Sequence, residues 1–209
     1  MISTEQIEQN KNEFLGLVES ITREGIDRDT LVKQLTNSDF FTAPASSNYH
    51  SNYEGGLCEH SLNVYYNLLS LVQSKGITCY SEDTLKIVAL FHDFDKMNKY
   101  EKTFQNKKVY KPNGSKHDAG GYFDWEVVEG YKTIDADNRF LFGTHGQNSL
   151  FMTQRFIPLS TEESCAILHH MGGKDVEVKE MPQIFRRYNL SLLLHLADMI
   201  ATFIDEKEE

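Results

Sequence analysis

Apolar positions recur at helical spacing along most of the chain, and this pattern predicts a mainly α-helical protein. Near the start, Ser3 stands three residues before Gln6, the spacing of a capping box, and apolar residues then recur on one helical face as far as Ile21. A second short helix is expected from about Asp29. Further helices are predicted over residues 57–72, 84–92, 147–156, 161–171 and 188–205.

Two segments depart from the helical pattern. Residues 40–56 are rich in Ser, Asn, Gly and Pro, which predicts an ordered loop. Residues 103–142 contain turn signals at Pro112-Asn113-Gly114 and Gly120-Gly121, followed by an aromatic and β-branched stretch. The expected fold is therefore all-α with a small β-hairpin insertion at about residues 103–142. We expect one domain over 1–209, with an N-terminal helical extension (1–36) and a core (37–205).

Composition supports an ordered protein of a reducing compartment. The chain has 209 residues, 40% hydrophobic and 25% charged, which excludes a disordered or collagen-like class. Three cysteines are too few and odd in number for a disulfide framework. The N-terminus lacks an apolar signal sequence, and no uncharged apolar run approaches the roughly 18 residues of a membrane span. We therefore expect a cytoplasmic protein without a membrane partner.

The charge distribution bears on possible partners. Thirty-one acidic and 21 basic residues give a net charge of −10, which disfavours duplex nucleic acid as a partner. Seven lysines between Lys96 and Lys116, against the single acid Glu101, give that stretch +6 and leave −16 for the rest. Two interpretations remain open at this point. The stretch is either a solvated loop or a cationic loop that attracts an anionic substrate.

Polar residues interrupt three of the apolar helical segments. His60 lies within the 57–72 helix, His92-Asp93 follows the apolar run IVALF, and Asp198 lies within SLLLHLADMIATF. A histidine in such a position is more often a hydrogen-bonded core residue than a metal ligand. A buried carboxylate, however, requires a cation, a metal or strong donors. Together the helices could supply a nitrogen and oxygen site suited to Zn, Mn, Fe, Ni or Co.

The order of these residues resembles the HD-domain superfamily of metal-dependent phosphohydrolases, and most nearly its small phage and bacterial members. The resemblance covers residues 40–198 and implies the helical bundle of that superfamily. It rests on five segments in order: GGLCEHSLNVY, ALFHDFDK, FGTHGQNS, ILHHMGG and LLHLADMIA. A second HD pair, His117-Asp118, follows the lysine-rich stretch instead of a buried helix, so we do not expect it to bind metal.

The resemblance implies a site for one or two divalent ions, with Mn, Fe, Zn, Ni, Co and Mg as candidates. The implied ligands of the first ion are His60, His92, Asp93 and Asp198. A second ion would be held by His145 and His170, with Asp93 bridging the two ions. His169 remains an alternative to His170, because each stands three residues before a glycine. His195 is expected in the core or behind the ligands.

The implied catalytic residues are Asp93 and Lys96. Lys96 follows His92-Asp93 at the spacing HD-x-x-K, at which many relatives place a lysine on the substrate phosphate. Lys99 is a second candidate for substrate binding. Asp95 stands where relatives have a small residue, and it either neutralises Lys96 or faces solvent.

The function implied is a phosphohydrolase that uses metal-activated water to cleave a phosphate ester or anhydride of a nucleotide or related small molecule. One alternative is an HD-fold oxygenase with a di-iron site, and another is a binding module without turnover. An exonuclease like the bacterial HD-containing 3′–5′ exoribonucleases is a further alternative, but those enzymes carry an additional nucleic-acid-binding domain that this length does not accommodate. The sequence leaves the substrate, the metal and the oligomeric state open.

Overall fold

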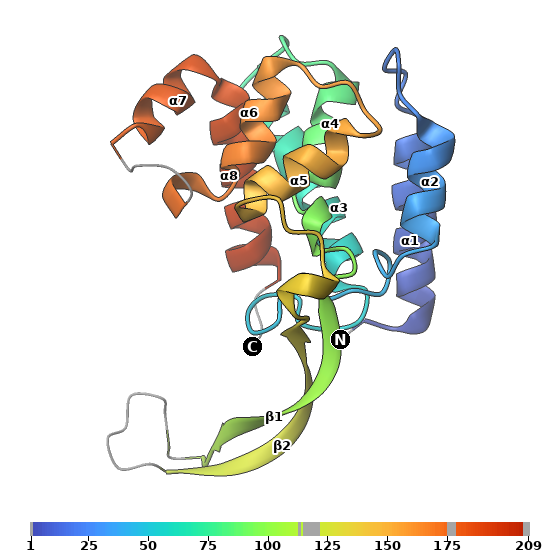
Figure 1. Cartoon of the computed structure of the whole chain (residues 1–209). Helices are drawn as coiled ribbons and strands as arrows, with labels where there is room; N and C mark the ends of the chain where they lie inside the picture. Colours follow the sequence, from blue (N-terminus) through green and yellow to red (C-terminus); the bar gives the residue numbers. More distant parts are fainter. Residues whose placement is uncertain (1, 113, 115–121, 175–178, 207–209) are drawn as a thin grey trace.

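The computed structural model describes residues 2–112, 114, 122–174 and 179–206, and within these it is mostly helical with one antiparallel two-stranded hairpin (Figure 1). The predicted helical class and the hairpin are both confirmed. The helices are α1 (Thr4–Glu19), α2 (Arg28–Thr36), α3 (Gly56–Ser74), α4 (Glu82–Phe91), α5 (His145–Gln154), α6 (Thr161–His169), α7 (Met181–Arg187) and α8 (Asn189–Ile200). Short turns of other helix types are η1 (Phe94–Lys96), η2 (Ala136–Asn138), η3 (Gly172–Lys174) and η4 (Ala201–Asp205).

Local side-chain hydrogen bonds explain where the helices begin. Ser3 Oγ accepts the N–H of Gln6 and caps α1 as predicted, although the Gln6 side chain donates to Asn10 and does not complete the box. Complete capping boxes open α5, at Thr144, and α6, at Ser160. The box at Thr144 starts α5 two residues earlier than expected. As a result, His145 occupies the first turn of the helix.

Two predicted helices end differently from expectation. α6 ends at His169, so His170 is its C-cap residue. The helix predicted over 188–205 is α-helical only to Ile200 and continues as a π-helical turn over Ala201–Asp205. Such turns are rare and often lie at functional sites. The turn is followed directly by Glu206, which reaches the site described below.

α3 lies at the centre of the bundle. It packs against α1, α4 and α8, while α6 packs against α4, α5 and α8. The core around the C-terminal end of α4 is aromatic. Phe14 and Phe94 each contact both Phe40 and Phe91, with ring centroids 4.9–6.0 Å apart. No helix among the described residues is long and apolar enough to cross a bilayer.

The hairpin projects away from the helical body (Figure 1). β1 (Tyr100–Tyr110) pairs with β2 (Phe123–Thr133), from Tyr100 opposite Thr133 to Tyr110 opposite Phe123. Much of the lysine-rich stretch is therefore a strand and not a loop. Its aromatic residues form no buried core, because Phe104 and Trp125 are 72% and 61% exposed. Of the predicted turn signals, Asn113 and Gly120-Gly121 lie outside the described residues, as do His117-Asp118.

A buried ion pair ties α6 to two other parts of the chain. The carboxylate of Glu163 accepts hydrogen bonds from Arg23, which precedes α2, and from Thr84 in α4, and it also accepts the N–H of Ser160. Burial alone would raise the pKa of Glu163. The hydrogen bonds, led by that of Arg23, outweigh burial and lower the pKa to about 2.

We predict that Glu163→Gln destabilises the protein by about 3 kcal/mol at pH 7, because a pKa lowered from 4.5 to about 2 contributes about 1.36 kcal/mol per unit. This contribution is complete above the unfolded pKa and declines as pH falls toward the folded pKa of about 2. Urea denaturation at pH 7 and pH 3 should therefore show a smaller difference between mutant and wild type at pH 3. Glu24→Gln, on the exposed surface, is the matched control. An equal difference at both pH values would contradict this account.

Candidate metal centre

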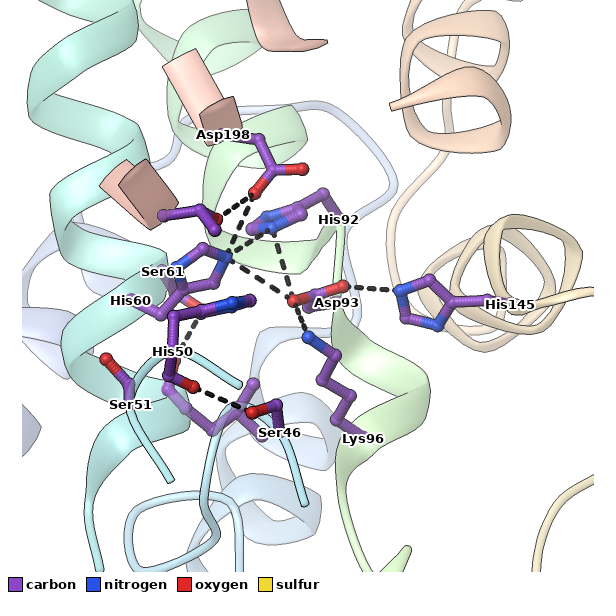
Figure 2. Close-up of polar contacts among 12 residues, drawn as sticks. Ser46, His50, Ser51, His60, Ser61, His92, Asp93, Lys96, His145 and Asp198 are labelled. Carbon is purple, nitrogen blue, oxygen red and sulfur yellow. Dashed lines mark hydrogen bonds and ion pairs between the residues drawn. The ribbon is translucent and has the colours of Figure 1, made fainter. Parts of the chain in front are cut away.

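Six buried or half-buried side chains from five helical segments meet beside α3 (Figure 2, which labels all but His170). Each comes from a different place in the fold: the second turn of α3, the C-cap of α4, the residue before η1, the first residue of α5, the C-cap of α6, and α8. In that order they are His60, His92, Asp93, His145, His170 and Asp198. The structure thus brings together all six expected metal ligands.

Asp93 lies at the centre of this group and is 2% exposed. Its Oδ1 lies 2.6 Å from His145 Nε2 and 3.4 Å from His170 Nε2. Its Oδ2 lies 3.5 Å from His60 Nε2 and 3.4 Å from His92 Nε2. Each oxygen therefore completes one triad with two histidines, and within each triad the ligand atoms lie within 4.8 Å of one another. This is the division expected of two metal positions that share Asp93.

Hydrogen bonds fix which ring nitrogen of three histidines faces the centre. His92 Nδ1 lies 2.7 Å from the carbonyl oxygen of Ala89, and His170 Nδ1 lies 2.7 Å from that of Ile167. A carbonyl oxygen can only accept, so each Nδ1 carries a proton and the neutral ring leaves a lone pair on Nε2. His60 Nδ1 lies 2.9 Å from Glu206 Oε1, which fixes its ring in the same way.

When the rings are neutral, the described residues offer no N–H donors to these lone pairs. His60 Nε2 and His92 Nε2 lie 3.2 Å apart, so two neutral rings in these tautomers would direct lone pairs at each other. His170 Nε2 is buried and makes no hydrogen bond to the described residues. A histidine whose far nitrogen donates to a carbonyl or carboxylate is the usual arrangement of a metal ligand. The donor set therefore fits one or two divalent cations.

Electrostatics also call for positive charge at the centre. Burial opposes protonation of His60, but Glu206 and Asp198 outweigh it and raise its pKa to about 10. Burial likewise opposes protonation of His145, and Asp93 and Asp95 raise its pKa to about 9. The pKa of Asp93 lies well below its ordinary value despite burial, chiefly because of Lys96. Without a metal, protonated histidines and Lys96 supply the positive charge that balances these carboxylates. A divalent cation would balance them in the same way.

The structure also places the expected catalytic lysine. Lys96 Nζ lies 2.5 Å from Asp93 Oδ2, and its side chain is 12% exposed. Burial lowers the pKa of Lys96, but Asp93 outweighs burial and raises it above the ordinary value. The lysine is therefore charged and next to the carboxylate that the two triads share.

The position of Asp95 differs from both expectations for this residue. It neither neutralises Lys96 nor faces solvent, since it is 4% exposed and lies 2.8 Å from Lys99 Nζ. Its Oδ1 also lies 2.6 Å from His145 Nδ1. The reason is the tight η1 turn, which directs Asp95 toward α5 while Lys96 points back to Asp93. Asp95 thus orients the His145 ring through Nδ1, on the side away from Asp93. Lys99, the second candidate for substrate binding, forms an ion pair with Asp95.

The two remaining histidines of the C-terminal half lie outside the triads of the described residues. His169 is buried but is not a member of either triad, so the structure brings His170 and not His169 to Asp93. His195 Nδ1 lies 2.7 Å from the carbonyl oxygen of His170, and its ring stacks on Phe185. His195 thus lies behind His170, where it was expected.

Sequence reasoning missed Glu206 and His50. The carboxylate of Glu206 accepts hydrogen bonds from His60, from Asn63 Nδ2 at 3.0 Å and from Ser51 Oγ at 2.7 Å. It stands in the run EKEE, where nothing in the pattern separates it from solvated acids. His50 packs against His60 with ring centroids 4.8 Å apart, but it lies in a polar loop without periodicity.

Comparison with protein-family models, curated proteins and solved structures gave no match to this chain.

We predict that His170→Gln removes metal binding at the triad of Asp93, His145 and His170, because the substitution deletes one of its three donors. Metal analysis of protein loaded with Mn²⁺ should show about one ion fewer per chain than the wild type. The adjacent substitution His169→Gln is the matched control and should retain the wild-type content. Equal metal loss in both variants would contradict the assignment.

Glu206→Gln should weaken metal binding by about 10–100-fold, the usual effect of losing a group that orients a ligand. The amide can present its N–H to His60 Nδ1 and so favour the wrong ring tautomer. Calorimetric titration with Mn²⁺ measures the change. Glu54→Gln, at an exposed ion pair with Lys102, should bind as the wild type does. Unchanged affinity in Glu206→Gln would show that Glu206 does not support the site.

Proposed function

We propose that this protein is a metal-dependent phosphohydrolase of the HD-domain superfamily, which cleaves a phosphate ester or anhydride of a nucleotide or related small molecule. One observation carries the proposal. Two triads, each of two histidines and Asp93, share that carboxylate, and the same carboxylate contacts Lys96, whose side chain is 12% exposed. The first provides a place for divalent ions, and the second provides a cation for an anionic substrate at that place.

The protein side of the metal site follows from its donors. His60, His92, Asp93 and Asp198 would hold one ion, and Asp93, His145 and His170 would hold a second. Nitrogen and oxygen donors of this kind suit Mn, Fe, Co, Ni or Zn. Ions so held supply Lewis acidity to phosphoryl oxygens and lower the pKa of water toward neutrality.

Lys96 provides the charge that phosphoryl transfer requires. An ammonium group has three N–H donors, and Asp93 is its one ion-pair partner in the described part of the chain. The other donors are available to phosphoryl oxygens, on which negative charge develops in the transition state. Because Lys96 is largely shielded from water, its interaction with such an oxygen is stronger than that of a surface lysine.

The hairpin lysines have a lesser role in this proposal. Lys102 and Lys111 form ion pairs with Glu54 and Asp124, which reduces their attraction for an anion. Lys107 and Lys108 form no ion pair within the described residues, but they lie on β1, which extends away from the helices (Figure 1). We propose that these two act on substrate only through long-range attraction.

An HD-fold oxygenase would use the same six ligands, and a binding module would keep them without turnover. The contact between Lys96 and Asp93 favours phosphate chemistry, because a fixed ammonium matches a phosphoryl anion. Metal-loaded protein should release phosphate from at least one member of a panel of nucleoside mono-, di- and triphosphates, cyclic nucleotides and dinucleoside polyphosphates. Oxygen consumption with di-iron content, or no turnover with any tested metal, would count against the proposal.

Lys96→Ala should lower kcat/KM by about 10²–10³, the scale of losing one donor to a developing oxyanion. Metal content should stay at the wild-type level, since the lysine is not a ligand. The double variant Lys107→Ala/Lys108→Ala is the comparison. It should raise KM modestly at low salt and match the wild type at high salt. The reason is that salt screens long-range attraction, since the Debye length is about 10 Å at 0.1 M. Wild-type kinetics for Lys96→Ala would remove the lysine from the mechanism.

A further inference from the structure

The loop between α2 and α3 brings His50 to the metal centre. The His50 ring lies against His60, and Figure 2 shows it on the side of its loop that faces Asp93 and Lys96. Its Nε2 is buried and has no hydrogen-bond partner among the described residues. Leaving a buried polar atom unpaired is energetically unfavourable. The position therefore calls for a partner that the described residues do not supply.

The loop holds His50 firmly in this place. Ser46 Oγ donates to the His50 carbonyl oxygen at 2.8 Å, and the Ala45 N–H donates to the Ser51 carbonyl oxygen at 3.0 Å. Ser51 has a positive φ of 47°, which turns the chain sharply after His50. A Cβ on Gly56 would lie 2.2 Å from the Ser51 carbonyl oxygen, so the glycine permits this close approach of loop and helix. The position of the His50 ring thus follows from the hydrogen bonds and the turn of its loop.

A third metal position does not explain His50. His50, His60 and Glu206 do form a further group with ligand atoms within 4.8 Å. However, His60 Nδ1 lies against Glu206, so a neutral His60 with its proton on Nδ1 has one lone pair, on Nε2. An ion bound by that lone pair would lie beside Asp93 and Asp198. An ion between His50 and His60 would require a second lone pair on the same ring.

Substrate is the partner that the surroundings favour. The His50 ring packs against His60, and His60 Nε2 lies 3.5 Å from Asp93 Oδ2, the oxygen that Lys96 contacts. His50 therefore borders the place where the lysine is proposed to meet phosphate. A neutral imidazole can present an N–H at Nε2 to an oxygen acceptor. We infer that His50 is a further substrate-contacting residue, whose Nε2–H donates a hydrogen bond to an oxygen of the substrate phosphoryl group. This inference rests on the proposed phosphohydrolase function.

Three variants test the inference in Mn²⁺-loaded protein. His50→Phe keeps the ring shape without a hydrogen-bond donor, His50→Gln keeps an N–H donor, and Tyr49→Ala alters an exposed neighbour in the same loop. We expect His50→Phe to lower kcat/KM by about 10²-fold on the best substrate of the panel and to weaken the binding of inorganic phosphate measured by calorimetry. His50→Gln should recover part of both losses. Tyr49→Ala should match the wild type, and metal content should be unchanged throughout.

Each outcome decides the matter. Loss of metal in His50→Phe would make His50 a ligand and overturn the inference, as would wild-type kcat/KM and phosphate affinity in that variant. If His50→Phe does not fold, His50→Ala takes its place, since it also lacks a donor. A lower kcat/KM in His50→Ala at unchanged melting temperature supports the inference, and wild-type kinetics overturn it. A wild-type protein that neither binds phosphate nor hydrolyses any panel member overturns the proposed function and this inference together. An active wild type with a silent His50→Phe overturns the inference alone.

Discussion

The burial of Asp93 is the constraint on which this structure depends. A carboxylate in an apolar helical interior is stable only if its charge is compensated on every side. Here the compensation comes from Lys96 on the same turn and from imidazoles on four helices. The packing of α3, α4, α5 and α6 against one another is therefore also an electrostatic requirement. A change that separates these helices would leave a buried charge without partners.

Helix termini do most of the positioning. His92 and His170 are C-cap residues, and their Nδ1–H groups satisfy carbonyl oxygens that the helix ends would otherwise leave unpaired. His145 occupies the first turn of α5, which its capping box fixes. In each case one hydrogen-bond arrangement both ends or begins the helix and orients the ring. The stability of the helix end and the geometry of the site are consequently coupled.

How much of this was accessible from sequence depends on how local each signal is. His60 and Asp198 stood out because polar residues interrupt apolar helical runs, and that property is written in neighbouring residues. His145 and His170 lacked such a signal and were expected only from the resemblance. Glu206, His50 and the burial of Asp95 depend on contacts between segments far apart in the chain, which periodicity does not encode. For the same reason the lysine-rich stretch was expected as a loop, although cross-strand pairing makes much of it β1.

The π-helical turn at the end of α8 sets the direction of the chain that follows it. Each residue of an α-helix advances the rotation by about 100°. A π turn accommodates an additional residue, so its presence changes the phase of everything beyond Ile200 relative to Asp198. Asp198 and Glu206 thereby reach opposite sides of the same imidazole, Asp198 at Nε2 and Glu206 at Nδ1. During evolution this segment should therefore tolerate no deletion. Loss of one residue there would rotate Glu206 away from His60, although every residue of the site would still be present.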